Sequence, residues 1–157
     1  MTQSPVEYRP TDLREIDLIR PLWEKLNAHH RNNARAFRDL YRTWTFEDRK
    51  AYFEKVAGAG DLRLDLAVDP ASGQCLGYCV SSFSQDGTGE IESVFVEEPY
   101  RSQGIGTNLI TRALAWLDLH HPERVRVSVA DGNEEAFPFY RKFGFYPRLT
   151  VLERKRD

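Results

Sequence analysis

Much of the fold is decided by one stretch, Val94-Phe-Val-Glu-Glu-Pro-Tyr-Arg101-Ser-Gln-Gly104-Ile-Gly106-Thr-Asn-Leu-Ile110. Its first part is rich in β-branched and aromatic residues, and Pro99 ends this strand because proline cannot donate to a sheet ladder. Beyond Gly106, apolar residues recur at helical spacing: Leu109, Ile110, Ala113, Leu114 and Leu117. The first amides of such a helix lack an internal partner and lie at the positive end of its dipole. Because Gly104 and Gly106 let phosphate oxygens approach these amides, the stretch predicts an anion site.

A glycine turn of this kind can also serve only to pack a helix on a strand. Leu109 stands where the dinucleotide fingerprint G-x-G-x-x-G needs a third small residue. No Gly-Lys-Ser/Thr follows the turn, as a P-loop would require. The stretch therefore departs from both common nucleotide-binding patterns, and a nucleotide- or NAD-binding domain is disfavoured.

Two motifs instead resemble one protein family. The form Arg101-x-x-Gly104-x-Gly106 resembles the coenzyme A signature of the GNAT N-acetyltransferase superfamily. Asn133-Glu-Glu-Ala136-Phe-Pro-Phe-Tyr140-Arg-Lys-Phe-Gly144-Phe145 resembles the closing pattern of the same family, with Asn, Ala, Tyr and Gly-Phe in order. The motifs occur in family order and at family spacing, and the resemblance covers the chain from about Val6 to Glu153.

The resemblance implies an α/β fold, the GNAT fold, in a single domain over residues 1–157. We expect a mixed central sheet of about six to seven strands, flanked by about four helices, with splayed parallel central strands. Only 12 residues follow Phe145, so the long terminal hairpin common in the family cannot form. A single last strand is expected over Leu149–Glu153. Pro138 should bend the last helix, which begins at Asn133 and closes at Gly144.

Local signals also place the elements of the first half. Val6–Arg9 is the expected first strand, stopped by Pro10, and Pro21 should kink or divide the helix that follows. Residues 29–45 are predicted to be loop or short helix. Thr45–Asp48 has the form of a capping box at the start of the next helix.

Composition excludes several classes of protein. With 157 residues, 41% of them hydrophobic, the chain suits one domain with its own core, and a net charge of −2 argues against a general nucleic-acid binder. No run approaches 18 apolar residues and Met1–Pro5 does not resemble a signal peptide, so neither a membrane protein nor a secreted one is expected. The chain has two cysteines, Cys75 and Cys79, and no further His or Cys completes a metal-binding set with them. We therefore expect a reducing, cytoplasmic location and no structural metal.

The coenzyme site follows from the resemblance. It implies that Glu90–Val96 and Val125–Val129 splay apart, with the thioester of acetyl-CoA in the gap; ordinary pairing along both strands is the alternative. Backbone groups of Val94, Phe95 and Val96 would bind the pantetheine amides as an added strand does, and one N–H could polarise the thioester carbonyl. The expected diphosphate-binding turn comprises Arg101, Ser102, Gln103, Gly104, Ile105, Gly106 and Thr107.

Two residues of the second motif have implied roles. Tyr140 matches the family tyrosine whose phenol lies near the coenzyme sulfur and can protonate the departing thiolate. A core aromatic at helical spacing is the alternative for this position. Asn133 matches a family asparagine that binds the pantetheine arm, and a simple helix N-cap is its alternative.

The reaction also needs a neutral amine. A lysine-like amine, with a pKa near 10.4, is neutral in roughly one molecule in 2,500 at pH 7, so a base must help. Glu90 and Glu92 are the candidates, because their spacing of two puts both on one face of the strand. By family position Glu90 falls where histone-directing members carry their base, whereas Glu92 lies nearer the thioester and could act through a water. An ordinary Glu pKa near 4.3 makes a poor base unless burial raises it, and an exposed carboxylate without a role is the alternative for each.

The predicted function is direct transfer of acetyl from acetyl-CoA to a primary amine of a small molecule or peptide. Neither cysteine matches a nucleophile position, which argues against a covalent enzyme intermediate. A non-catalytic acetyl-CoA-binding sensor or partner-binding domain is the alternative, and a homodimer is a further possibility because such domains often dimerise. Acceptor specificity in the family comes largely from the first two helices and the loop between them. Adjacent aromatics and arginines in this region would suit an anionic or planar acceptor, or merely packing between helices: Trp23, His29, His30, Arg31, Arg35, Arg38, Tyr41, Trp44 and Phe46.

Overall fold

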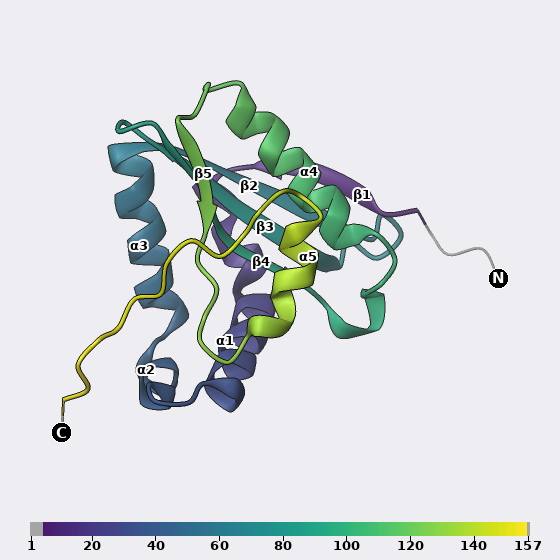
Figure 1. Cartoon of the computed structure of the whole chain (residues 1–157). Coiled ribbons are helices and arrows are strands. Elements are labelled where there is room, and N and C mark those ends of the chain that lie inside the picture. Colours follow the sequence, from purple (N-terminus) through teal and green to yellow (C-terminus); the bar gives the residue numbers. More distant parts are fainter. Residues whose placement is uncertain (1–4, 157) are drawn as a thin grey trace.

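The computed structural model describes residues 5–156, which form one mixed sheet covered by helices (Figure 1). The strands follow the order β1-β2-β3-β4-β5 across the sheet, and their bounds are Glu7–Thr11 (β1), Gly60–Val68 (β2), Cys75–Ser84 (β3), Thr88–Val96 (β4) and Arg124–Val127 (β5). Neighbouring strands from β1 to β4 are antiparallel, and β5 is parallel to β4. An α/β fold with a mixed sheet is confirmed.

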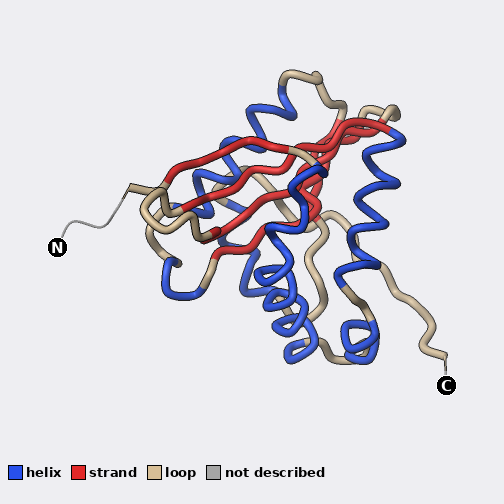
Figure 2. Tube along the Cα trace, turned by 180° about the vertical axis from the view of Figure 1, so that it is seen from behind, coloured by secondary structure: helices blue, strands red, loops and turns tan. Residues whose placement is uncertain are grey.

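Helices lie on both faces of this sheet (Figures 1 and 2). The α-helices are Arg20–Asn33 (α1), Arg38–Thr43 (α2), Phe46–Ala59 (α3), Ile105–Asp118 (α4) and Phe137–Arg141 (α5), and three 3-10 helices are Leu13–Ile19 (η1), Glu98–Tyr100 (η2) and Glu134–Ala136 (η3). One core cluster joins η1, α1 and α3 to the sheet, with Phe53 and Tyr78 fully buried. A second joins α4 to the opposite face, with Leu109 and Cys79 fully buried.

The predicted start signals of the helices in the first half are confirmed, but α1 extends to Asn33, into the residues 29–45 that were expected to be loop or short helix. Pro21 divides the segment into η1 and α1 and occupies the first turn of α1, where its missing N–H is not needed. Thr45 and Asp48 form the capping box of α3, through the bonds Asp48 N–H to Thr45 Oγ1 (3.2 Å) and Thr45 N–H to the Asp48 carboxylate (3.0 Å). The expected end of the first strand before Pro10 was wrong: β1 continues through Pro10 to Thr11, because β1 is an edge strand and a missing donor is tolerated there.

The expected number of strands was wrong. Residues 5–156 form five strands instead of six to seven, and the predicted last strand at Leu149–Glu153 is irregular chain. Its apolar side chains do not find a core: Leu149 is 61% exposed, Val151 78% and Leu152 91%. Without burial on one face, a strand at the edge of the sheet gains too little to offset its ordering entropy. There are five α-helices rather than about four, because residues 38–43 form the short helix α2.

The last helix also differs from expectation. The chain forms η3 first, and α5 begins only at Phe137, so Pro138 lies in the first turn and does not bend the helix. Gly144 has φ of +86°, which confirms the left-handed position after the helix.

Strands β4 and β5 diverge, as the resemblance implied. Their parallel pairing runs only from Thr88–Arg124 to Ile91–Val127, although β4 continues to Val96. A β-bulge starts the divergence: Ser93 pairs with Val80 and Ile91 with Ser81, so Glu92 is the extra residue of β4. Because a bulge bends its strand and redirects side chains, it opens the wedge and sets Glu92 at its apex.

Candidate active site

A cavity of about 270 Å³ lies in this wedge. Its walls come from β4, from the end of β5 and the chain that continues it, from α5, and from α1, α2 and α3. The lining residues are Trp23, Leu26, Asn27, His30, Tyr41, Trp44, Arg49, Ile91, Glu92, Ser93, Val94, Val127, Ser128, Val129, Ala130, Asn133 and Tyr140. Of the residues predicted from sequence, the structure brings Glu92, Val94, Asn133 and Tyr140 together at this cavity.

Glu92 is held at the apex by two residues of α3. Tyr52 donates its phenol proton to Glu92 Oε1 at 3.3 Å, and Arg49 Nη2 donates to the backbone oxygen of Glu92 at 2.6 Å. Burial raises the pKa of the Glu92 carboxyl to about 7, and the neighbouring Glu90 carboxylate adds to this shift. A carboxyl group with such a pKa is suited to general base chemistry near neutral pH.

Glu90 lies outside the cavity lining. Its Oε1 forms an ion pair with Arg126 Nε at 3.3 Å, between paired residues of β4 and β5. Glu90 therefore acts on the cavity through its charge, which raises the pKa of Glu92. The two carboxylates that spacing left equivalent are distinguished by the structure.

Tyr140 lines the cavity from α5. Burial raises the pKa of its phenol, so the group stays protonated at neutral pH. The ring also packs edge-on against Phe139 and Phe145, with centroids 5.2 and 6.0 Å away. Core packing and access to the cavity are therefore compatible at this position.

Asn133 contacts the first helix instead of capping η3. Its Oδ1 lies 3.2 Å from His29 Nε2, and within residues 5–156 its side chain forms no capping hydrogen bond. The N-cap alternative is thus not what the structure shows. The contact with His29 fixes the side chain at the rim of the cavity, where the amide nitrogen remains available as a donor.

The glycine turn has the geometry of an anion site. Gly104, with φ of +85°, is the N-cap of α4, and the first amide bonded within the helix is that of Asn108, which donates to Gly104 O at 3.0 Å. The amides of Ile105, Gly106 and Thr107 precede it and are the unpaired donors of the helix end. Residues 101–104 are exposed, so a diphosphate can reach these amides.

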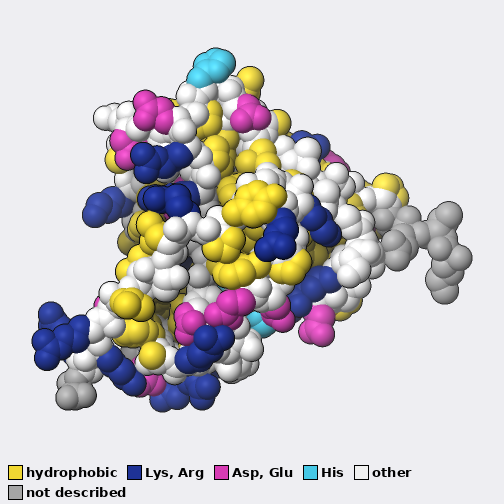
Figure 3. Space-filling model, in the orientation of Figure 1, with side chains coloured by type: hydrophobic (Ala, Val, Ile, Leu, Met, Phe, Trp, Pro, Cys, Tyr) yellow, Lys and Arg dark blue, Asp and Glu magenta, His cyan; other side chains and the backbone are white. Residues whose placement is uncertain are grey.

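Neighbouring residues of the turn hold its shape. Arg101 Nε donates to Val96 O at 2.9 Å, and its guanidinium lies 5.1 Å from the centre of the Phe95 ring. Ser102 adopts φ of +63°, and Gln103 Nε2 donates to Pro99 O at 3.3 Å. Figure 3 shows apolar side chains gathered over α4 and α5 with basic side chains beside them. Arg101 is therefore a support of the turn as well as a candidate phosphate ligand.

The described residues offer neither a metal site nor a membrane-spanning helix. Among residues 5–156, no group of three or more His, Cys, Asp or Glu side chains could hold a metal ion. Within the same described span, the helices are too short or too polar to cross a membrane.

A sequence model of the Acetyltransferase (GNAT) family matches residues 23–145. The chain belongs to this family. The match begins in α1 and ends after α5, so it includes the wedge and the glycine turn.

Two curated relatives of this GNAT chain carry acetyltransferase names. An uncharacterized N-acetyltransferase of Methanocaldococcus jannaschii is 32% identical over 72 residues, which cover 46% of this chain and 32% of the relative. An N-alpha-acetyltransferase of Sulfolobus acidocaldarius is 40% identical over 58 residues, covering 36% of this chain and 34% of the relative. The matched region spans about a third of the length of each relative.

Solved structures agree with the GNAT fold. A protein of Bacillus halodurans superposes with a TM-score of 0.76 at 18% identity, covering 96% of this chain and 99% of the other. The aminoglycoside N-acetyltransferase AAC(6')-Iy in complex with CoA superposes with a TM-score of 0.71 at 17% identity, covering 99% and 98%. A putative acetyl transferase from Pyrococcus furiosus gives 0.71 at 20%, covering 96% and 100%.

Sequence reasoning missed the supports of Glu92. Arg49 and Tyr52 lie one turn apart on α3, after the capping box, and both reach β4. The only signal in the sequence was a basic and an aromatic residue at helical spacing, which also describes an ordinary amphipathic helix.

Proposed function

We propose that the chain transfers the acetyl group of acetyl-CoA directly to a primary amine of a small molecule or peptide. One observation carries this proposal: Glu92 and Tyr140 line the same cavity, where β4 and β5 diverge. Glu92, with a pKa of about 7, can accept a proton, and Tyr140, whose pKa is raised, has one to donate. The proposed base and acid thus face the same space.

The proposed coenzyme site fits the residues present. The diphosphate would bind the free amides of Ile105, Gly106 and Thr107, assisted by the turn Arg101–Gly104. The pantetheine arm would follow the side of Val94–Val96 that β5 leaves, and the Asn133 amide would bind it at the rim. Acetyl-CoA supplies the acetyl group as an activated thioester.

The transfer exchanges the C–S bond of the thioester for a C–N bond, with an acetamide and the free thiol as products. Glu92 removes one proton from the acceptor ammonium, directly or through a water, and so supplies the neutral amine. A backbone N–H of β4 stabilises the carbonyl oxygen as it becomes negative. Tyr140 gives one proton to the leaving sulfur and recovers one as the nitrogen releases its second proton on forming the amide, while Glu92 passes its proton to solvent, so that an ammonium and a thioester give an acetamide, a thiol and one proton.

An amine panel with acetyl-CoA, read by thiol release, tests the function. Calorimetry with acetyl-CoA alone supplies an independent binding measurement. We expect binding together with turnover of at least one amine, and failure to bind acetyl-CoA at millimolar concentration would refute the proposal. Binding without turnover of any primary amine would instead favour the non-catalytic sensor.

A further inference from the structure

The cavity has an aromatic wall opposite the strands, formed by Trp23, His30, Tyr41 and Trp44. Trp23 and His30 come from α1, Tyr41 from α2, and Trp44 from the residue after α2. The rings of His30 and Tyr41 lie 5.5 Å apart, and those of Tyr41 and Trp44 also 5.5 Å. Trp44 is 47% exposed, so the outer end of this wall is open to a ligand, whereas Trp23 is 5% exposed and belongs to the core.

The aromatic wall is fixed in place before any ligand binds. Asn27 of α1 donates through Nδ2 to Tyr41 O at 2.8 Å and to Trp44 O at 3.4 Å. Both bonds tie the end of α2 to α1. A prebuilt apolar wall costs little ordering entropy on binding, which favours a ligand of matching shape.

The aromatic wall is uncharged near neutral pH. Burial lowers the pKa of His30 to about 4, so its imidazole is neutral, and burial raises the pKa of Tyr41. Besides the wall, three other ionisable side chains line the cavity: Arg49, Glu92 and Tyr140. Arg49 donates to Glu92 O and its guanidinium lies 4.7 Å from the centre of the Phe53 ring, so it is held against β4 and α3, and Glu92 supplies the carboxylate of the lining.

Acidic residues beyond the rim are already paired. Arg35 Nη1 lies 3.2 Å from Asp131 Oδ1, and Arg35 Nη2 lies 3.2 Å from Glu134 Oε1. His29 Nε2 lies 3.1 Å from Glu135 Oε1. A further ammonium group of a polyamine would have to compete with Arg35 for Asp131 and Glu134, and at this exposed position such a pair would contribute little to binding.

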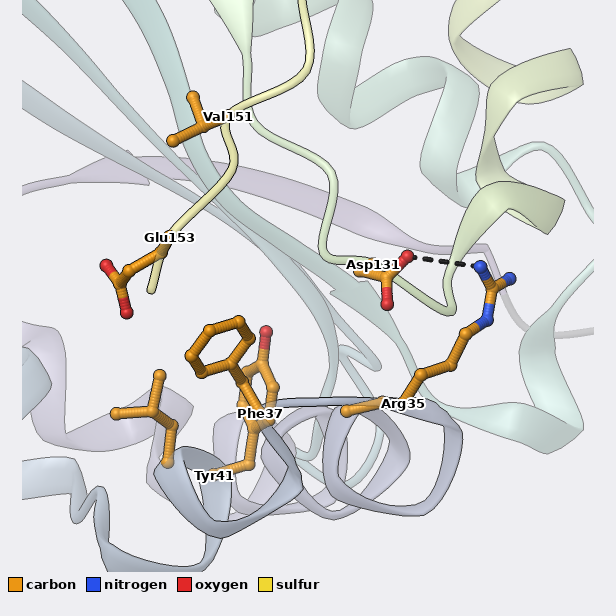
Figure 4. A pocket seen from close by; sticks show the side chains of 8 residues that line it. Arg35, Phe37, Tyr41, Asp131, Val151 and Glu153 are labelled. Atoms are coloured by element: carbon orange, nitrogen blue, oxygen red, sulfur yellow. Dashed lines mark hydrogen bonds and ion pairs between the residues drawn. The ribbon is translucent and has the colours of Figure 1, made fainter. Parts of the chain in front are cut away.

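A second cavity, of about 220 Å³, offers the rival arrangement. Figure 4 shows Phe37 and Tyr41 on one side of it, and Val151 and Glu153 on the other. Glu153 could meet a second ammonium group of a long polyamine. A variant at this position therefore separates the two classes of acceptor.

We propose that the acceptor is a primary monoamine that carries an aromatic ring on a short alkyl linker. The ring stacks on Trp44 and Tyr41, because aromatic pairs gain stability beyond their buried area. The ammonium group then points to Glu92, where it gives up its proton. This inference rests on the proposed acetyl transfer and adds the class of acceptor.

The test compares 2-phenylethylamine with n-butylamine, spermidine and neamine by thiol release from acetyl-CoA. We expect kcat/KM for 2-phenylethylamine to exceed that for each other amine about tenfold or more, a ratio equivalent to 1.4 kcal/mol. Trp44→Ala should raise KM for 2-phenylethylamine about tenfold with little change in kcat, and leave KM for n-butylamine within twofold. The exposed Tyr146→Ala is the matched control, and Glu153→Gln should change nothing.

Higher kcat/KM for spermidine or neamine, or their loss in Glu153→Gln, would overturn the inference in favour of a polycationic acceptor. An equal effect of Trp44→Ala on all amines would also overturn it. Tryptophan fluorescence with CoA present separates it from the failure of acetyl transfer itself. Saturable quenching by 2-phenylethylamine that is lost in Trp44→Phe supports the aromatic site even without turnover, and no quenching refutes it.

Discussion

At the scale of single residues, the site depends on one carboxyl group kept in an unfavourable environment. Glu92 is the bulged residue of β4, partly buried beside a second carboxylate, and its pKa is about 7. The raised pKa means that the ionised form is less stable in the folded state than in the unfolded chain. Stability and chemistry thus oppose each other at this residue.

Glu92→Gln tests both consequences. Between pH 4.5 and 7 the folded state binds more protons at Glu92 than the unfolded chain does, so this group lowers stability as pH rises. Glu92→Gln should therefore raise the free energy of unfolding at pH 8 by about 1 kcal/mol or more, since one pKa unit corresponds to about 1.4 kcal/mol. Turnover should fall about 100-fold or more, and the limb near pH 7 in the pH profile of kcat/KM should disappear.

Glu90→Gln is the control for that experiment. It removes the charge that raises the pKa of Glu92, so the limb should move to lower pH while turnover persists. Identical profiles for the two variants would leave neither carboxylate assigned as the base. Chemical denaturation at pH 5 and pH 8 supplies the stability measurements.

Tyr140→Phe removes the proposed acid and keeps the ring. Because the ring that packs against Phe139 and Phe145 is kept, the packing of α5 should persist. We expect kcat to fall about 100-fold and the Kd for acetyl-CoA, from calorimetry, to change less than threefold. The exposed Tyr146→Phe should leave both values unchanged. An unaltered kcat in Tyr140→Phe would remove this residue from the mechanism.

At the scale of elements, the glycine at the start of α4 contributes in two ways: it adopts the left-handed conformation of the turn, and it leaves the helix amides accessible. Gly104 has φ of +85°, and no neighbouring heavy atom lies within 4 Å of the position that a Cβ would occupy. Gly104→Val should cost about 1–2 kcal/mol of stability from left-handed strain. It should also raise the Kd for acetyl-CoA more than 100-fold, because the side chain would block approach to the amides.

Gly73→Val is the control for Gly104→Val, because it introduces the same left-handed backbone strain outside the glycine turn. Gly73 lies in the turn between β2 and β3, with φ of +75° and the same open space. It should lose similar stability while acetyl-CoA affinity is kept. Equal affinity in both variants would place the diphosphate elsewhere.

Helix α3 offers a separate prediction, because it carries Arg49 and Tyr52 to the bulge of β4. Thr45→Ala breaks the capping box and should lower the free energy of unfolding by about 1 kcal/mol. Thr43→Ala, which removes an exposed hydroxyl bonded to the carbonyl groups of α2, should change it by less than about 0.5 kcal/mol. Urea denaturation measures the free energy of unfolding of both variants. Equal decreases in the two variants would show that the capping box does not stabilise α3.

The elements that sequence predicted well are those with local signals. Local chemistry fixes the backbone at these positions. Capping oxygens mark the helix start at Thr45–Asp48, the fixed φ of proline marks the break at Pro21, and the missing side chain of glycine marks the turn at Gly104 and Gly106. The bulge at Glu92 could not be foreseen, since it depends on register against β3, and register is set across strands. For the same reason, spacing could not distinguish Glu90 from Glu92.

At the scale of the whole molecule, the two core clusters explain why the fold tolerates an open wedge. One cluster binds α1 and α3 to the sheet and the other binds α4, so each face is packed up to the wall of the wedge, where Trp23 and Ile91 line the cavity. Residues 88–91 and 124–127 pair, and the wedge opens beyond them. The family resemblance predicted this arrangement, but composition and periodicity alone did not.

The chain after Arg148 gives a prediction at this scale. Leu149, Val151 and Leu152 are all more than half exposed, and a well-exposed side chain contributes little burial to folding. Deletion from Leu149 onward should therefore change the free energy of unfolding by less than about 0.5 kcal/mol. Urea denaturation of the shortened and full chains measures this difference.

Sedimentation of both chains supplies the control, because dimerisation would cover apolar side chains that a single copy exposes. If the full chain sediments as a dimer and the shortened chain as a monomer with a loss of 2 kcal/mol or more, the segment is buried between copies. The expected result is one sedimenting species, of the same oligomeric state, for both chains. In that case the residues from Leu149 onward neither hold copies of the chain together nor pair with the edge of β5.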